Sequence, residues 1–214
     1  MAMPFSVEEF FAVFARYNAA TWPLHVLAIA MGLAVSLLAL RRRGAPARLV
    51  LTVLAAFWLV NAVGYHWLYF AVINPVARVF AAGFLLQATL LLRAATRSPD
   101  LRLSFRGAPR AVIGGSLCAF ALVLYPVWGW LAGHAWPAVP AFGVAPCPTT
   151  IFTIGMLFGG NWRRVSHLLV VPALWAVIGG SAAILLRVPQ DFALLAAAAL
   201  VAGTGLAMAL RRRV

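Results

Sequence analysis

Seven apolar runs occupy most of the chain, and most of them stop at or next to an arginine. Their predicted ranges are 22–40, 49–66, 74–92, 111–131, 149–162, 165–186 and 192–210. A helix needs about 20 apolar residues to cross a bilayer, and all of these runs except 149–162 come close to that length. The pattern predicts an all-α, polytopic transmembrane helix bundle of about seven spans, with residues 1–214 forming a single integral membrane domain.

Residues 6–20 show a different pattern, in which the apolar side chains share one face of a helix. Phe10, Val13, Phe14 and Tyr17 follow the i, i+3, i+4, i+7 spacing, whereas the two glutamates of this stretch fall elsewhere around the helix. Helices of this kind lie in the plane of the membrane interface. We therefore expect an N-terminal interfacial amphipathic helix ahead of the first span.

The charges predict how the bundle is oriented. All seventeen basic residues are arginines, and fourteen of them fall on one predicted side of the membrane: Arg41–Arg43, Arg48, Arg93, Arg97, Arg102, Arg106, Arg110, Arg163, Arg164 and Arg211–Arg213. The positive-inside rule places this side in the cytoplasm, with the N-terminus outside and the C-terminus inside. The same rule accounts for the net charge of +13 without a nucleic-acid partner.

Composition excludes several classes of protein. The chain is 64% hydrophobic and 10% charged, with a mean hydropathy of +0.97, which is unlike a soluble enzyme or a disordered chain. Because it contains no lysine, it can form neither a Schiff base nor a Walker-type phosphate loop. Its four acidic residues are too few for a carboxylate-bridged di-iron bundle. No catalytic residues are predicted.

The acidic residues are expected at the edges of the membrane. Asp191 and Arg187 are predicted to cap the turn before the last span and to face water. With no carboxylate expected in the middle of a span, the sequence counts against a proton-driven cation pump, which usually needs one there.

The segment 139–150 carries the strongest local signal. Pro140, Pro146 and Pro148 forbid a continuous helix, yet the segment is nearly uncharged. The run that follows, 149–162, would span only about 21 Å, which is short of the bilayer core. We expect a Pro-rich re-entrant segment that enters from the outer side, with a surface loop as the alternative.

A polar binding site is predicted near the outer face, next to this segment. The helix that begins at Thr149 and Thr150 would present unpaired backbone N–H groups inside the membrane. Tyr69, Asn74 and Arg78 lie at the turn into the third span. These five residues are the candidate ligand-binding set, with snorkelling to the headgroups as the alternative for Arg78.

A metal site is a second candidate on the same face. His25, His66, His134 and Cys147 all fall near the predicted outer ends of spans, and imidazole with thiolate binds transition metals well. His25 and His66 could also supply the two axial ligands of a haem. The alternative is that these are interfacial side chains without a metal, because no local ligand motif is present.

The chain resembles a bacterial family of uncharacterised multi-spanning membrane proteins. The resemblance lies in Tyr65–Phe70, in Ile73-Asn74-Pro75, in Tyr125-Pro126, in Gly133-His134 and in the stretch from Phe142 to Thr153. It extends to Tyr17-Asn18 and Trp22-Pro23 near the start of the chain. Because that family is a domain of unknown function, the resemblance implies no activity.

Three function classes remain open from the sequence. The broken fifth span favours a small permease or channel in a bacterial inner membrane, which would carry a small solute or a metal ion across the lipid bilayer. The alternatives are a membrane protein that binds a transition metal or haem, and a non-catalytic scaffold subunit. Pairs of small residues such as Gly155 and Gly159 are expected to pack helices and could also support a homo-oligomer.

Overall fold

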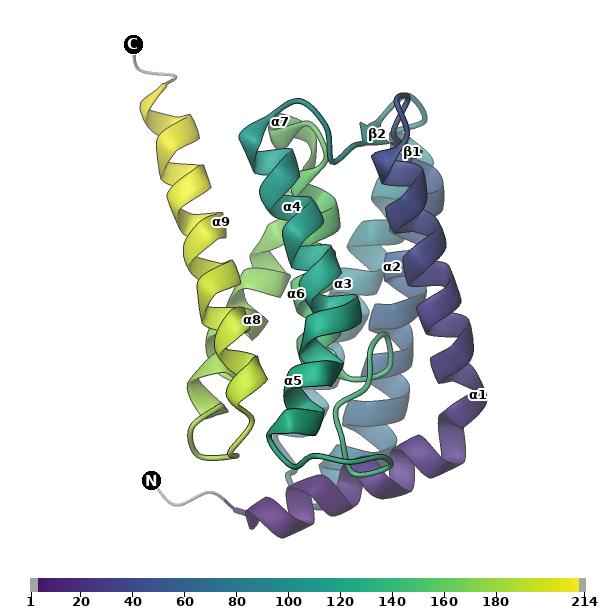
Figure 1. Cartoon of the computed structure of the whole chain (residues 1–214), viewed down its shortest axis with the longest axis vertical. Helices are drawn as coiled ribbons and strands as arrows, with labels where there is room; N and C mark the ends of the chain where they lie inside the picture. Colours follow the sequence, from purple (N-terminus) through teal and green to yellow (C-terminus); the bar gives the residue numbers. More distant parts are fainter. Residues whose placement is uncertain (1–3, 212–214) are drawn as a thin grey trace.

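The computed structural model describes residues 4–211 and shows a helix bundle (Figure 1). Within this part of the chain, six helical segments are long and apolar enough to cross a membrane, so the chain is an integral membrane protein. They are Val7–Leu40, Ala47–Val72, Ala77–Arg97, Pro109–Leu131, Trp162–Ala182 and Pro189–Leu210. The expected all-α bundle is confirmed. Arg212 and Arg213 of the expected basic tail lie outside the described residues.

Several of these segments contain more than one kind of helix. The α-helices are α1 (Val7–Leu40), α2 (Ala47–Val60), α3 (Ala77–Arg97), α4 (Pro109–Ala119), α5 (Tyr125–Leu131), α6 (Pro146–Phe158), α7 (Trp162–Val165), α8 (Val170–Ala182) and α9 (Phe192–Leu210). π-Helical segments continue α2 over Asn61–Tyr69 and join α4 to α5 over Phe120–Leu124. Short 3₁₀ segments cover Phe70–Val72, Ser166–Leu169 and Pro189–Asp191.

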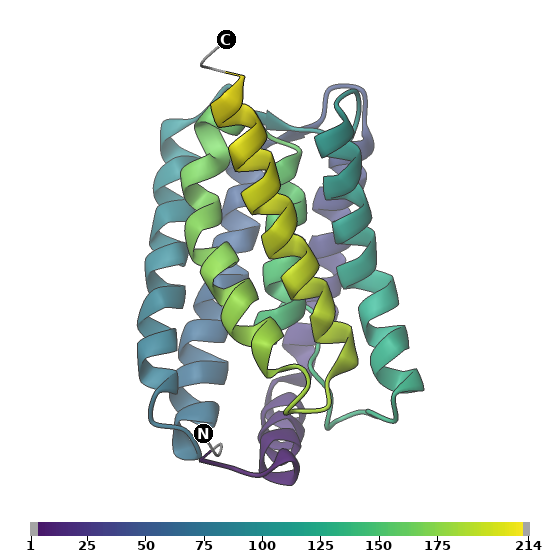
Figure 2. The ribbon, with the colours of Figure 1, turned by 90° about the vertical axis from the view of Figure 1, so that its left-hand side faces the viewer.

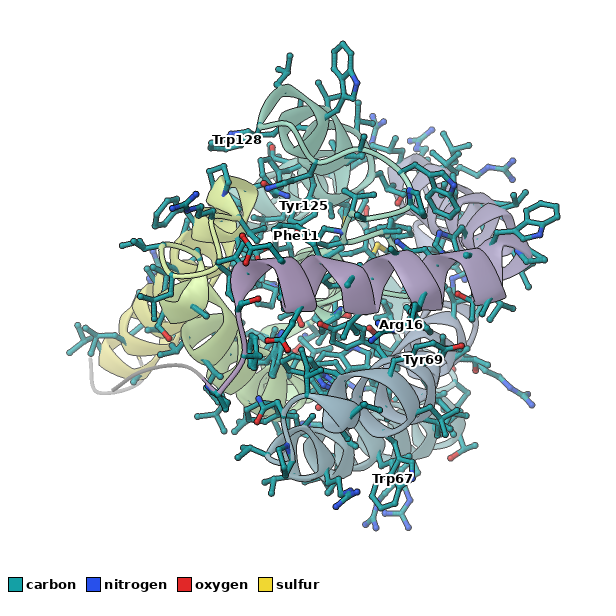
Figure 3. The ribbon with its side chains drawn as sticks, turned by 90° about the horizontal axis from the view of Figure 1, so that it is seen from below. Phe11, Arg16, Trp67, Tyr69, Tyr125 and Trp128 are labelled. Atoms are coloured by element: carbon teal, nitrogen blue, oxygen red, sulfur yellow. The ribbon has the colours of Figure 1, made fainter. Side chains whose placement is uncertain are left out.

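The expected interfacial helix and first span form one bent helix, α1. Ser6 caps its start, because the Ser6 hydroxyl accepts from the Glu9 N–H and the Glu9 carboxylate accepts from the Ser6 N–H. Figures 1 and 3 show the first part of α1 crossing one end of the bundle before the helix turns along it. Pro23 lies inside α1, and a proline removes one helical hydrogen bond and kinks a helix.

The expected fifth span is the short helix α6, and it lies at the centre of the bundle. All thirteen of its residues are buried, against α2, α4, α8 and α9. Pro146 stands in its first turn, where a missing N–H costs nothing. Other helices expose large apolar side chains, as a lipid-facing surface requires. Figure 2 shows α9 (yellow) lying beside α8 (green) along the bundle.

The two ends of the bundle differ in composition. At one end lie the arginines between α1 and α2, those between α3 and α4, and those of α7 and the end of α9; we call it the arginine-rich end. A two-residue antiparallel bridge pairs β1 (Ala45–Pro46) with β2 (Arg102–Leu103) there. The opposite end carries the first part of α1 and the segment 132–145, and we call it the proline-rich end.

Candidate functional site

The segment 132–145 rises from the proline-rich end into the bundle (Figure 1). Two asparagines hold it: the Asn18 side chain donates to the carbonyls of Pro137 and Val139 across 2.6 and 2.7 Å, and Asn61 donates to the Gly143 carbonyl across 3.1 Å. Gly143 has a φ of +77°, and a Cβ there would lie 2.5 Å from the Ala28 methyl group. The first residues of this segment are exposed, but from Pro140 on it packs inside the protein and delivers Cys147 to the interior.

Both π-helical segments supply residues to the same region. Asn61–Tyr69 carries Tyr65 and His66 on its inner side, and Phe120–Leu124 directly precedes Tyr125. Tyr65, His66 and Tyr125 are all buried. A π-helical turn shifts the side chains that follow it around the helix axis, and such turns occur frequently at functional sites.

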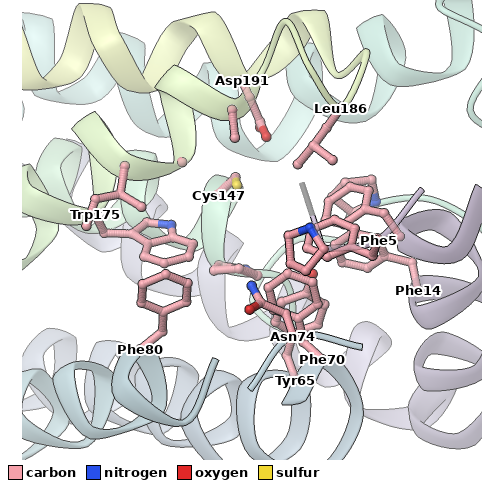
Figure 4. Close-up of a pocket in the computed structure, with 17 residues that line it drawn as sticks. Phe5, Phe14, Tyr65, Phe70, Asn74, Phe80, Cys147, Trp175, Leu186 and Asp191 are labelled. Carbon is pink, nitrogen blue, oxygen red and sulfur yellow. The ribbon is translucent and has the colours of Figure 1, made fainter. Parts of the chain in front are cut away.

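A cavity of about 190 Å³ lies between these segments (Figure 4). Seven of its seventeen lining residues are aromatic: Phe5, Phe10, Phe14, Tyr65, Phe70, Phe80 and Trp175. The rings pack edge to face or stacked, with centroids 5.2 Å apart for Phe80 and Trp175 and 5.4 Å apart for Tyr65 and Phe70. We call this cavity the aromatic pocket.

Asp191 is the acidic residue of the aromatic pocket. Its side chain points into the cavity opposite Tyr65 and Phe70, and only 4% of the residue is exposed (Figure 4). The Tyr125 hydroxyl donates to Asp191 Oδ1 across 2.5 Å, and the Cys147 thiol lies beside the same carboxyl. Burying a carboxyl is costly unless it is hydrogen-bonded, and Tyr125 supplies that bond.

The expectation that Asp191 and Arg187 both face water is wrong for Asp191. Arg187 is exposed, but the 3₁₀ turn Pro189–Asp191 folds the chain back so that Gln190 and Asp191 both face the interior. The sequence gives no local signal for this, since Tyr125 and Cys147 come from distant segments. Asp191 is the third residue of the membrane segment Pro189–Leu210, so it places a buried carboxyl at the end of a span and not in its middle.

Several buried polar atoms around the aromatic pocket have no hydrogen-bond partner among the described residues. They include both ring nitrogens of His66, the indole nitrogen of Trp175 and both amide atoms of Gln190. His66 is packed between the rings of Phe84 and Trp175, at centroid distances of 4.6 and 5.1 Å. Unsatisfied buried groups cost stability, and in native proteins they gather where function requires them.

Of the five predicted ligand residues, only Asn74 lines the aromatic pocket. Tyr69 packs against the Tyr17 ring at 5.1 Å. Arg78 is exposed and lies 5.9 Å over the Trp67 ring, on the outside of the bundle. Thr149 and Thr150 are buried on α6 outside the pocket lining, and Thr149 Oγ1 accepts weakly from Asn61 across 3.4 Å.

The four predicted metal ligands are not gathered into one cluster. Within residues 4–211, no three His, Cys, Asp or Glu side chains are placed to hold a metal ion. His25 packs on Trp136 at 5.0 Å and His134 on Phe11 at 4.4 Å, while His66 and Cys147 lie near the aromatic pocket. Burial lowers the pKa of His134, since a charged imidazole would lose its hydration.

Comparison with known proteins gives one match. A model described as "Family of unknown function (DUF6064)" matches residues 7–214, nearly the whole chain. No curated protein and no solved structure matches. The match agrees with the resemblance to an uncharacterised family and assigns no activity, so function has to be argued from the aromatic pocket.

Proposed function

We propose that this chain, which belongs to the DUF6064 family of unknown function, is a small permease that binds its solute in the aromatic pocket. The observation that carries the proposal is a cavity with a buried, hydrogen-bonded carboxyl, which lies where the non-helical segment 132–145 leads into α6. Interrupted helices build the binding sites of many transporters, because their ends and loops place polar groups inside the membrane.

The aromatic pocket reaches the protein surface on one side. Pro4 and Ile178 line it and are exposed, and Phe5 and Asn74 beside them are partly exposed. In the proposed permease, a solute would therefore enter beside Pro4 and Phe5, between the segment that precedes α3 and the end of α8. Under the positive-inside rule the proline-rich end faces outward in a bacterial inner membrane, so this side would receive solutes from outside.

At the arginine-rich end, hydrogen bonds tie the end of α6 to the neighbouring segments. The Arg110 guanidinium donates to the carbonyls of Phe158 and Gly160 at the end of α6, and the Ser104 N–H donates to the Gly159 carbonyl across 2.9 Å. In the proposed permease, this arrangement would be the state open toward the proline-rich end, because the aromatic pocket reaches the surface on that side. Release on the other side requires α6 to separate from these contacts, as alternating access demands.

Solute uptake into proteoliposomes tests the proposal. The purified chain is reconstituted, and uptake of labelled choline, glycerol and acetate is compared with uptake by empty vesicles. Ala182 lines the pocket, so Ala182→Trp fills it; Ala199→Trp places the same bulk at an exposed position on α9. Both variants are first checked for a single monodisperse species in detergent.

We expect protein-dependent uptake of at least one probe that Ala182→Trp abolishes and Ala199→Trp leaves intact. The permease assignment would be contradicted if none of the probes enters above the background of empty vesicles. It would also be contradicted if the pocket-filling variant transported as well as the unmodified chain.

A further inference from the structure

We infer that the aromatic pocket selects small organic cations, a quaternary ammonium group above all, with Asp191 as the counter-charge and the surrounding rings as the wall. This inference rests on the proposed function, because it names the solute class of the same pocket. It is carried by the charge of the lining, by the aromatic wall and by the shortage of free hydrogen-bond acceptors.

The charge of the lining favours a cation. Asp191 is the acidic side chain among the described lining residues, and no arginine or histidine stands among them. The nearest arginine in sequence, Arg187, is exposed outside the cavity. An anionic solute would meet the carboxylate without a compensating positive side chain, whereas a cation would neutralise it.

The aromatic wall favours a cation that keeps no hydration shell. Phe80 and Trp175 stand on one side of the cavity, and Tyr65 and Phe70 lie opposite Asp191 (Figure 4). The face of an aromatic ring carries negative electrostatic potential and attracts a cation within about 6 Å. Rings that surround an alkylated ammonium can replace the water it loses on binding.

The small number of free hydrogen-bond acceptors favours the binding of a quaternary ammonium group over that of a primary one. Among the side chains of the lining, Asp191 Oδ1 already accepts from Tyr125, and Asn74 Oδ1 accepts from the Val76 N–H across 3.2 Å. Asp191 Oδ2 and the Tyr65 hydroxyl are then left to accept from a ligand. A primary ammonium has three N–H donors that would need partners. A quaternary ammonium has none, so its burial leaves no donor unsatisfied.

The volume limits the size of the cation. The cavity measures about 190 Å³, and in another protein a cavity of about 150 Å³ accepts benzene. A trimethylammonium group is of comparable size. Tetrabutylammonium carries four butyl chains and is expected to be excluded.

Equilibrium binding to the purified full-length chain tests the inference with a matched pair of probes. Choline and 3,3-dimethylbutan-1-ol have nearly the same shape, but only choline is charged. Binding is followed by intrinsic tryptophan fluorescence, since Trp175 lines the pocket, and is repeated by equilibrium dialysis with labelled choline. We expect choline to bind at least about tenfold more tightly than its neutral isostere.

Three variants test whether the preference for choline over its neutral isostere depends on the charge of Asp191. Asp191→Asn is expected to lower choline affinity by about tenfold or more while leaving the isostere unchanged. Asp191→Glu keeps the charge and should retain the preference, which guards against a folding defect in the asparagine variant. Asp100→Asn removes an exposed carboxylate near the arginine-rich end and should change neither affinity.

Equal affinity for choline and the isostere, or a preference that persists in Asp191→Asn, would overturn the inference. The outcome is separable from that of the permease assay. Choline binding without transport of any probe would refute the permease and leave the cation site standing. Transport of glycerol that Ala182→Trp blocks, without a choline preference, would refute the cation site alone.

Discussion

The two ends of the bundle differ in how their polar groups are hydrogen-bonded. At the arginine-rich end, Arg102 donates to the backbone carbonyls of Arg43 and Gly44, in the turn before β1. Arg110 donates to the carbonyls of Phe158 and Gly160, at the end of α6. At the proline-rich end, His66, Trp175 and Gln190 bury polar atoms that have no partner among the described residues. At the arginine-rich end, an arginine side chain bonds the backbone carbonyls at the end of α6, whereas at the proline-rich end several buried polar atoms remain unpaired beside the aromatic pocket.

The arginine-rich end contributes mainly to the stability of the fold, whereas the proline-rich end holds the proposed binding site. Close backbone packing and hydrogen-bonded carbonyls hold α4 and α6 together near the arginine-rich end. At the proline-rich end, the cavity and the unpaired buried polar atoms lower the stability of the fold, as is common at functional sites. Substitutions at the two ends should therefore have different consequences.

The largest expected effect is on helix packing near the arginine-rich end. A Cβ at Gly155 would lie 2.7 Å from the Gly114 carbonyl oxygen and 2.8 Å from Cys118 Sγ. Gly155→Val should therefore cost about 3 kcal/mol of stability or more, because backbone has to move. Thermal unfolding in detergent measures the loss. Gly83→Val, at a position with no atom within 4 Å of the added Cβ, is the control; equal losses would refute the close contact.

A smaller loss is expected when the cap of α6 is removed. Arg110→Ala leaves the Phe158 and Gly160 carbonyls without their donor and should destabilise the fold by about 1–3 kcal/mol. Arg106→Ala, at an exposed position nearby, should change stability little. If both variants unfold at the same temperature, the hydrogen bonds of Arg110 to α6 contribute nothing measurable to stability.

At the proline-rich end, removing a buried polar side chain should raise the stability of the fold instead of lowering it. His66→Phe replaces a buried imidazole without hydrogen-bond partners by a ring of similar shape among Phe80, Phe84 and Trp175. We expect a gain of about 1 kcal/mol, because the burial cost of two polar atoms disappears. A lower melting temperature in this variant would mean that the His66 nitrogens form a bond that stabilises the native state.

The smallest effect is a pH dependence at His134. Burial against Phe11 lowers the His134 pKa below the ordinary value of 6.5, so the unfolded chain takes up a proton first as the pH falls. Stability should therefore decline as the pH drops through about 6.5, and His134→Phe should reduce that decline. Melting temperatures at pH 8 and pH 5 measure it, with His167→Phe, exposed near the arginine-rich end, as the control. An unchanged decline in His134→Phe would contradict the assignment.

The fold follows from the sequence to a large extent, since it depends on local pattern. Span length predicts the membrane helices, and the spacing of Phe10, Phe14 and Tyr17 predicts the face of α1 that is buried. The short run 149–162 predicts a helix that begins inside the bundle after Pro148; the observed helix α6 begins earlier, at Pro146. These features need no knowledge of which helices are neighbours.

The aromatic pocket could not be predicted in the same way, because its residues meet only through packing. Tyr125, Cys147 and Asp191 come from three separate segments, and Trp175 comes from a fourth. Asp191 follows a proline and a glutamine, a context typical of an exposed turn, and only the 3₁₀ geometry turns it inward. The predicted set shares with the pocket lining only Asn74 and Cys147.

The most direct test of the contrast between the two ends is the rate at which thiosulfonate reagents modify the two cysteines. Cys147 lines the aromatic pocket, whereas Cys118 is buried 3.6 Å from the Phe152 carbonyl on α6. Trimethylammonium-ethyl and sulfonato-ethyl methanethiosulfonates are applied to the full-length chain, with rates normalised to a free thiol. The account predicts that Cys147 reacts faster with the cationic reagent, that Asp191→Asn removes the difference, and that Cys118 does not react. A Cys147 that is unreactive, or that reacts equally with the anionic reagent, would contradict it.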